Sequence, residues 1–328
     1  MIKYLLMILF VGFHFCAYNQ IVNGVVINNK TKEVIPFATI YFNGTTTGTS
    51  SNLDGLFEIN IQKHSSNPIV VSAIGYNSEL IEDLITDDQI TVKLRPKIYD
   101  IDEAVVQSKS LVRQRRINLR IFKREFIGET ENSWDCKILN EEDISFNYFH
   151  DDDTLKAYTS KPIIIENKAL GYNITYFLDK FEYYKDSKST YFRGNFIFKE
   201  DSTINKEMVE KKREYTYNGS RMHFFRSLWA DDLKSNDFKI RNSKGKVIKY
   251  KDVVIINDEG NKYLRNNGNI TIQYHTIESK LILSTRLLPF NQNGSFGSTG
   301  ILWEGDMSIY RIADWLPLDY KKGDVNPK

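Results

Sequence analysis

The chain has 328 residues, enough for roughly two domains of ordinary size. Its 44 Lys and Arg against 42 Asp and Glu leave a formal charge of +2, which argues against a nucleic-acid-binding protein, because such proteins usually carry a marked basic excess. With 41% hydrophobic residues, 18 Gly, 7 Pro and 2 Cys, the composition also excludes general disorder, collagen, a coiled coil, a disulfide scaffold and a multi-span membrane protein.

Residues 1–20 have the pattern of a secretory signal peptide. Lys3 precedes an apolar run from Tyr4 to Phe15, and polar residues follow it. The run is shorter than the about 20 residues that span a bilayer. The bulky residues before Cys16 favour simple cleavage over lipid modification, so we expect an exported protein. Cleavage leaves Cys136 as a lone thiol, a type that is more often buried and inert than catalytic.

Residues 21–95 predict a mainly β unit, a seven-stranded β-sandwich. Polar and apolar side chains alternate along residues 57–61 and 90–94, which places one face on a core and the other in water. The clearest strands are Ile21–Asn28, Ala38–Asn43, Leu56–Gln62, Ile69–Ile74 and Ile90–Leu94. Short strands separated by close turn signals are typical of a sandwich.

Turn-forming residues punctuate these strands. We assign structural turn roles to Gly24, Pro36, Gly48, Asp54 and Gly55. Asp54-Gly55 directly precedes an alternating run, which predicts a β-hairpin, because Gly tolerates positive φ there.

These residues resemble the carboxypeptidase regulatory-like domain. The resemblance rests on segments at 24–26, 34–40, 43–49, 52–57, 70–76, 92–94 and 101–106. The resemblance implies a transthyretin-like Greek-key sandwich of the kind found in Gram-negative envelope proteins, where many such domains precede outer-membrane receptors. The expected location is therefore the periplasm or the periphery of the outer membrane. These motifs report a fold and say little about function.

Residues 96–111 are expected to link the sandwich to a β-rich α+β domain over 112–320, with a tail at 321–328. A basic stretch from Lys109 to Arg124 has apolar residues near helical spacing, which predicts an amphipathic helix. The basic side chains of residues 109–124 could contact acidic lipid headgroups or an acidic partner. Alternatively, they form a solvated helix face.

The larger region contains further strands and one helix. Seven strands are predicted, at 144–148, 161–166, 172–181, 189–198, 253–256, 270–275 and 280–286. Gly219–Leu233 predicts a helix whose stripe of Met222, Phe225, Trp229 and Leu233 belongs in the core. Blocks at 122–128, 164–172, 217–226 and 311–320 resemble stand-alone members of the same envelope group, and the resemblance implies no activity for them.

One cluster is a candidate contact for an anion or a partner. Tyr217, Arg221, His223 and Arg226 lie on or just before the predicted helix. The alternative is that both arginines face water while His223 is a hydrogen-bonded packing residue.

Searches for catalytic patterns give little. His275 and Glu278 spell H-x-x-E, but no histidine follows, and in an alternating strand residues three apart point to opposite faces. Asp151–Asp153 lacks the spacing of a calcium loop. No nucleotide-binding or nucleophile-elbow motif occurs, so no catalytic, metal or cofactor-binding residue is assigned.

The sequence thus predicts an exported, non-catalytic binding or scaffolding protein of the cell envelope. Its partner is expected to be an envelope protein or a glycan, contacted through the sandwich, and no nucleic acid or cofactor is expected. Two alternatives stay open: a metal-independent hydrolase whose carboxylates meet only in the fold, and an accessory of an outer-membrane transporter.

Overall fold

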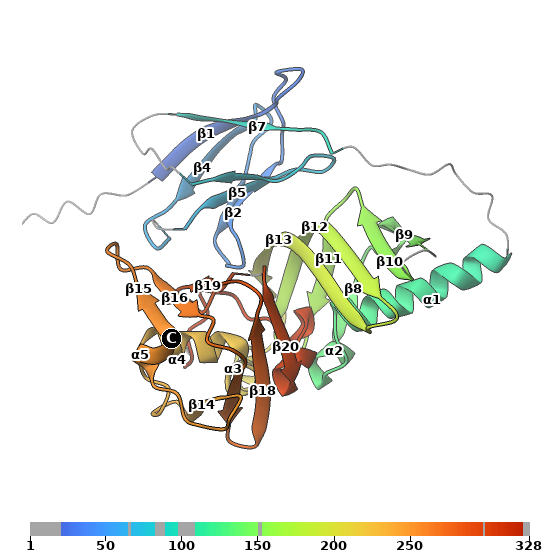
Figure 1. Cartoon of the computed structure of the whole chain (residues 1–328). Coiled ribbons are helices and arrows are strands. Elements are labelled where there is room, and N and C mark those ends of the chain that lie inside the picture. The colour runs from blue at the N-terminus through green and yellow to red at the C-terminus, as the bar shows by residue number, and fades with distance from the viewer. Residues whose placement is uncertain are drawn as a thin grey trace, which may run out of the picture.

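A computed structural model describes the chain in six stretches: residues 21–64, 67–82, 89–97, 109–149, 153–297 and 299–323. The predicted signal peptide and most of the predicted linker lie outside these residues. The protein is mainly β. In Figure 1, the sandwich of β1 to β7 lies at the top, a sheet of β8 to β13 at the right, and smaller sheets of β14 to β20 at the lower left.

The N-terminal unit is a β-sandwich of seven described strands in two sheets. The first sheet has the order β4-β1-β7 and the second β3-β2-β5-β6. β1 pairs antiparallel with β4 and parallel with β7. The strands are β1 (Ile21–Asn28), β2 (Thr39–Phe42), β3 (Gly48–Ser50), β4 (Leu56–Asn60), β5 (Ile69–Ser72), β6 (Glu79–Ile81) and β7 (Ile90–Leu94).

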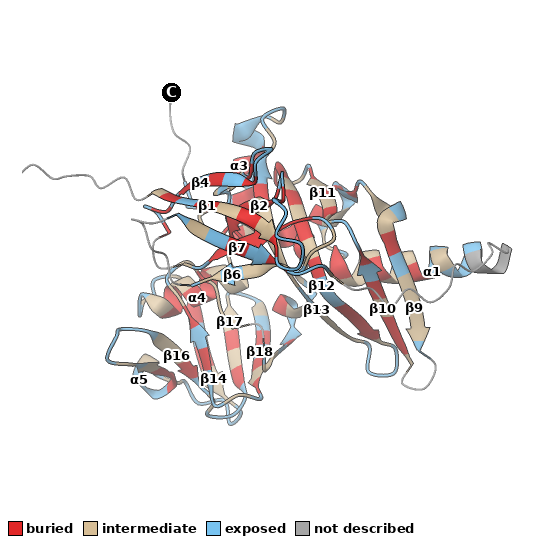
Figure 2. Ribbon diagram, turned by 90° about the horizontal axis from the view of Figure 1, so that it is seen from above, coloured by how far each residue is buried: buried red, intermediate tan, exposed pale blue. Residues whose placement is uncertain are grey.

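Alternation along these strands builds the sandwich core, as predicted. Phe57 and Ile59 of β4 point inward and are buried, whereas Leu56 and Glu58 point outward. They meet fully buried side chains of the facing sheet, such as Phe42. Burying a side chain of this size contributes about 1.5–3 kcal/mol. Figure 2 shows buried and exposed positions alternating along the strands.

The predicted turn roles hold at three positions and fail at two. Pro36 and Asp54 lie in turns, and Gly55 has φ +73°. Gly24 instead lies inside β1, and Gly48 begins β3. The reason is space: a Cβ on Gly24 would lie 2.5 Å from the Phe57 ring, and one on Gly48 would lie 2.4 Å from Ile197 Cδ1.

The hairpin predicted at Asp54-Gly55 is also wrong. β3 pairs with β2 and β4 pairs with β1, so the turn carries the chain from one sheet to the other. The Asx-type bond from Leu56 N to Asn52 Oδ1, 2.9 Å long, holds the turn. Turn chemistry reports the local φ, and the packing of the two sheets decides which strand pairs with which.

A six-stranded antiparallel sheet follows, in the order β8-β11-β12-β10-β9, with β13 paired to β12. Its strands are β8 (Cys136–Ile138), β9 (Ile144–Phe149), β10 (Thr154–Thr159), β11 (Ile163–Asn167), β12 (Tyr172–Tyr184) and β13 (Ser189–Glu200). Helix α1 (Lys109–Phe126) packs on it. Phe122 and Phe126 are fully buried and stack with centroids 4.7 Å apart. The predicted amphipathic helix is confirmed, and it begins within the predicted linker.

The third body packs small sheets around a helix. The sheets are β14-β17-β18-β20 and β15-β16-β19. Helix α4 (Arg221–Trp229) places Phe225 and Leu228 in their shared core. It is shorter than predicted, since Gly219 and Asp231, with φ +76° and +54°, stand just outside its two ends. The remaining elements are β14 (Phe238–Asn242), α5 (Tyr250–Val253), β15 (Val254–Ile256), β16 (Lys262–Arg265), β17 (Ile270–Tyr274), β18 (Ile277–Leu283), β19 (Leu287–Phe290) and β20 (Ile301–Gly305).

The region predicted as one α+β domain over 112–320 therefore contains two separate clusters of buried apolar residues. One lies between α1 and the six-stranded sheet, and the other surrounds α4. Alternation looks the same in both, so the sequence pattern could not separate them. None of the described helices combines the length and apolar character needed to cross a bilayer.

The last part of the described chain runs between the bodies. We call residues 311–322 the C-terminal segment. Its Ala313 N donates to Ile127 O at 3.1 Å, and its Leu318 N donates to Gly44 O at 2.7 Å. The remaining elements of the described chain are α2 (Glu131–Trp134), α3 (Lys206–Tyr217), η1 (Glu141–Asp143), η2 (Asp306–Ile309) and η3 (Ile312–Asp314).

Candidate functional site

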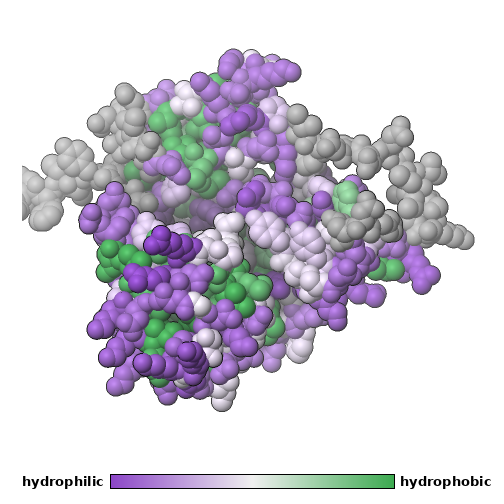
Figure 3. Space-filling model, viewed as in Figure 1, coloured by the Kyte–Doolittle hydropathy of each residue, from purple (hydrophilic) through white to green (hydrophobic). Residues whose placement is uncertain are grey.

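A cavity of about 330 Å³ opens where the three bodies meet. We call it the junction pocket and define it by an aromatic wall and a polar end. The wall consists of Tyr176, Phe192, Phe196, Phe296 and Trp315, and the polar end of Ser220, Arg221, Tyr310 and Asp314. Figure 3 shows that the face seen in Figure 1 is mostly hydrophilic, with separate apolar patches on the sandwich and on the region below it.

The aromatic wall follows from the pleat of β13. Phe192, Gly194 and Phe196 are two residues apart and share one face of the strand. Gly194 lets β12 approach closely here: a Cβ on Gly194 would lie 2.6 Å from Tyr176 Cε1 and 2.2 Å from Phe177 O.

Trp315 of the C-terminal segment completes this wall. Its ring centroid lies 4.8 Å from that of Phe196 and 6.0 Å from that of Phe192. Aromatic rings at such separations gain attraction beyond the area that they bury.

The sandwich contributes the loop between β2 and β3. Gly44 N donates to Phe196 O at 2.8 Å, and Phe198 N donates to Thr45 O at 2.9 Å. Asn43 Oδ1 accepts from Phe196 N at 2.8 Å. These bonds use the free edge of β13, as an added strand would. Asn43 and Gly44 thereby become part of the pocket lining.

The polar end is built on the first turn of α4. Ser220 caps the helix by accepting from His223 N at 3.1 Å. Arg221 follows, and its Nε donates to Met307 O at 3.0 Å. Its guanidinium lies 5.0 Å from the Trp303 ring centroid, a cation–π distance. Burial, followed by the nearby charge of Arg311, lowers the pKa of Arg221.

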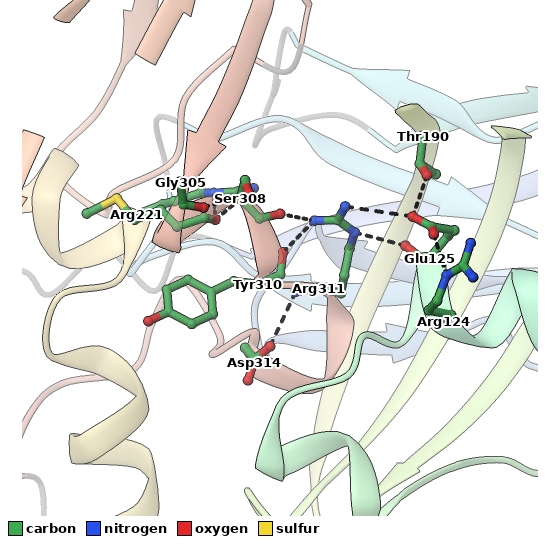
Figure 4. A network of polar contacts seen from close by, with 10 residues as sticks. Arg124, Glu125, Thr190, Arg221, Gly305, Ser308, Tyr310, Arg311 and Asp314 are labelled. Carbon is green, nitrogen blue, oxygen red and sulfur yellow. Dashed lines mark hydrogen bonds and ion pairs between the residues drawn. The ribbon is translucent and has the colours of Figure 1, made fainter. Parts of the chain in front are cut away.

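Arg311 ties the C-terminal segment to α1 beside this end. Its Nε donates to Glu125 O at 2.9 Å, and its Nη2 lies 4.0 Å from Glu125 Oε2. Glu125 Oε2 also accepts from Thr190 Oγ1 at 2.6 Å. Figure 4 shows Arg311 in the centre of this network, with Glu125 on one side and Ser308 on the other.

Asp314 is the only acid among the pocket-lining residues in the described stretches. Its Oδ1 accepts from Thr130 Oγ1 at 2.7 Å and from Asn132 Nδ2 at 2.9 Å. Its Oδ2 accepts from Arg311 N at 3.3 Å. Burial raises the pKa of this carboxyl. With both oxygens engaged, Asp314 positions the C-terminal segment.

The four residues predicted to contact an anion do not form one site. Arg221 lines the junction pocket. His223 is buried, accepts from Gly219 N at 3.1 Å on Nδ1 and lies 3.2 Å from Asn236 Oδ1 on Nε2. Tyr217 packs on the His223 ring.

Arg226 is partly buried and points toward the C-terminal segment. It donates to the carbonyls of Asn293, Leu318 and Tyr320 at 2.9 to 3.1 Å. Neither Arg221 nor Arg226 simply faces water, whereas the packing role considered for His223 agrees with its contacts.

The other sequence candidates lie away from the pocket. His275, with φ +48°, sits in the turn between β17 and β18, and Glu278 lies in β18. The H-x-x-E pair therefore straddles a hairpin, and the expected single strand was wrong. Within the described stretches, no group of three His, Cys, Asp or Glu side chains could hold a metal ion. Asp151 and Asp152 lie outside the described residues.

Cys136 is buried in β8, and burial raises its pKa to about 12. The thiol is therefore protonated at neutral pH and a poor nucleophile.

Sequence reasoning missed the aromatic wall. The spacing of Phe192 and Phe196 was visible as strand alternation, and Trp315 stands in a block that was noted without a role. Nothing in the sequence indicated that β13 and the C-terminal segment meet.

Comparison with protein families identifies the N-terminal part of the chain. Residues 22–106 match the family model of the CarboxypepD_reg-like domain. The resemblance found in the sequence is thereby confirmed for this part. No curated protein matches the chain.

Proposed function

We propose that this chain, whose residues 22–106 belong to the CarboxypepD_reg-like family, is an exported, non-catalytic binding protein of the cell envelope. Its junction pocket receives a small ligand. Domains of this family are of a binding or regulatory type. Export rests on the signal-peptide pattern of residues 1–20, and an envelope location on the family resemblance.

The observation that carries the proposal is the composition of the junction pocket. Small-molecule sites are concave and mostly apolar, with a few polar groups that orient the ligand. Here one wall is aromatic and one end carries Arg221, Tyr310 and Ser220. Hydrolysis of a glycoside by the usual mechanism needs two carboxyl groups facing the bond. Asp314 stands alone among the described lining residues, which favours binding over catalysis.

The pocket also gives the sandwich a role. The loop at Asn43–Thr47 holds one side of the pocket through the edge of β13. A ligand in the pocket would therefore contact the sandwich and the larger region together. We also propose that the sandwich contacts a partner, an envelope protein or a glycan.

Membrane contact through α1 also stays a proposal. Arg113, Arg116 and Arg120 are exposed and lie near one face of the helix, together with exposed Val112 and Ile117. Such a face suits an anionic membrane surface.

The pocket is tested by titrating the protein with the neutral fluorescent probe N-phenyl-1-naphthylamine. Ser295 lines the pocket, so Ser295→Trp should fill it and abolish the fluorescence increase. Ser187 is exposed on the β12–β13 turn, and Ser187→Trp is the matched control. Binding that survives Ser295→Trp, or turnover of chromogenic esters or glycosides, would contradict the proposal. Sequencing the N-terminus of envelope-fraction protein tests export.

A further inference from the structure

We propose that the ligand of the junction pocket is a small amphipathic anion, with its charged group held by Arg221 and its apolar body on the aromatic wall. This inference rests on the proposed function and adds the chemical class of the ligand. A carboxylate on an apolar body is the simplest member of the class.

The first argument is that the charge of Arg221 has no carboxylate partner among the described residues. Arg221 is partly buried, and a charge that is taken out of water is normally paired with an opposite one. Arg221 donates Nε and Nη2 to a single carbonyl, that of Met307, and no carboxylate of the described residues lies within 4.0 Å of it. Among the described residues its close partners are one carbonyl and one indole ring, and it borders a cavity.

The second argument is that neighbouring acids are already engaged. Glu125 accepts from Thr190 and Arg124 and lies beside Arg311. Both oxygens of Asp314 accept hydrogen bonds from other residues. The positive end of the α4 dipole points to the same place, since Ser220, Arg221 and Met222 all line the pocket. At this end of the pocket the guanidinium of Arg221 and the N-terminus of α4 therefore stand beside a single carboxylate of the described lining residues, that of Asp314, whose oxygens are already engaged.

The third argument is the shape of the remaining space. The cavity of about 330 Å³ lies at the lower end of the range for small-molecule sites. Phe192, Phe196 and Trp315 form a continuous aromatic surface beside it. An ion without an apolar part would leave this surface wet, so the pocket suits a ligand with both parts.

Arg193 also lines the pocket and must be distinguished from Arg221. Its side chain is 59% exposed, and its Nε lies 4.0 Å from Asp179 Oδ2. A cation at an exposed rim with a carboxylate nearby attracts a second anion weakly. We therefore assign ligand selection to Arg221.

The experiment uses protein expressed from the full chain, with N-phenyl-1-naphthylamine as the reporter and decanoate and 1-decanol as competitors. Decanoate should displace the reporter at about tenfold lower concentration than decanol, the scale expected for one charged hydrogen bond. Arg221→Gln should remove this preference. Arg221→Lys should keep part of it. Arg265→Gln changes an exposed arginine of β16 and should leave it intact.

The outcomes separate the two proposals. Equal displacement by decanoate and decanol in the unmodified protein would overturn the anion inference and leave the pocket standing. Loss of the preference in Arg193→Gln but not in Arg221→Gln would overturn the assignment to Arg221. Failure of the reporter to bind, or binding that survives Ser295→Trp, would overturn the proposed function itself. Thermal melting of each variant shows whether it is folded.

Discussion

Two partly buried arginines beside the C-terminal segment bind the main chain more than they bind acids. Arg226 donates to three carbonyls, and Arg311 donates to the carbonyls of Glu125, Ser308 and Tyr310. A guanidinium offers five N–H groups in a fixed plane, so one side chain can satisfy several carbonyls that secondary structure leaves free. Residues far apart in sequence become joined in this way.

The positive φ of Gly55 predicts that a larger residue there destabilises the sandwich. Gly55→Val should lower the free energy of unfolding by about 1–2 kcal/mol from backbone strain, because φ is +73°. A Cβ there would also lie 2.8 Å from Val26 O. Gly75→Val is the matched control in the same sandwich, with φ +82° and no atom within 4 Å of its Cβ. Urea unfolding measures both, and an equal loss in the two variants would remove the steric part of this account.

His223 predicts a pH dependence. Burial lowers its pKa in the folded protein, so the unfolded chain takes up a proton first as the pH falls below about 6.5. Protonation of Nδ1 would also abolish its bond from Gly219 N. The free energy of unfolding should therefore decrease by roughly 1 kcal/mol as the pH falls from about 7.5 to about 5.5.

His223→Asn should reduce this decrease when urea unfolding is compared at the two pH values. His275→Gln changes an exposed ring and should retain it. A decrease that His223→Asn leaves unchanged would show that other groups cause it.

At the scale of elements, the unpaired edge of β13 is where the sandwich attaches to the six-stranded sheet. An unpaired edge strand can accept another strand through its free N–H and C=O groups. Here the sandwich supplies that partner with the loop between β2 and β3. Gly48, which directly follows this loop, must stay small because Ile197 of β13 lies against it. The contact between the sandwich and the six-stranded sheet therefore depends on residue 48 having no side chain.

Gly48→Ala tests this contact. The added Cβ would lie 2.4 Å from Ile197 Cδ1 and should destabilise the protein by about 1–3 kcal/mol. In an Ile197→Ala background the same substitution should cost less, because the flexible obstacle has gone. A double-mutant cycle by urea unfolding measures the difference. An additive cycle would show that Ile197 and Gly48 do not press on each other in solution.

At the scale of the whole molecule, the C-terminal segment joins all three bodies. It contacts the sandwich through the bonds of Leu318 to Gly44 and of Asp319 to Thr46. It reaches α1 through Arg311 and α4 through Arg226. Tyr320 also donates to Glu210 of α3 at 2.9 Å. The junction pocket exists because this segment brings Trp315 to β13.

Arg226→Gln tests this role. It removes donors from three carbonyls and should lower the free energy of unfolding by about 2–4 kcal/mol. Hydrogen exchange should be faster at two amides of the C-terminal segment, that of Leu318, which donates to Gly44 O, and that of Tyr320, which donates to Pro317 O. Arg265→Gln removes an exposed arginine and serves as control. Unchanged exchange at these amides would mean that other contacts suffice to hold the segment.

Much of the local structure could be predicted from the sequence. The strands at 21–28 and 90–94 were predicted with their observed bounds, the second from its alternation, because burial on one face of a strand repeats every two residues. The family of residues 22–106 was also readable, since its turn and glycine pattern is local. The packing of Phe225 in α4 followed from helical spacing.

What only the tertiary structure decided is which of these elements meet. Phe196, Arg221 and Trp315 lie far apart in the chain, and neither spacing nor residue type indicates that they line one pocket. The sequence predicted turns at Gly24 and Gly48. Glycine is instead required at these positions because the side chains of Phe57 and Ile197 lie against them. The physical reason is that periodicity reports which side of an element is buried, whereas the partner on that side is set by the packing of the whole chain.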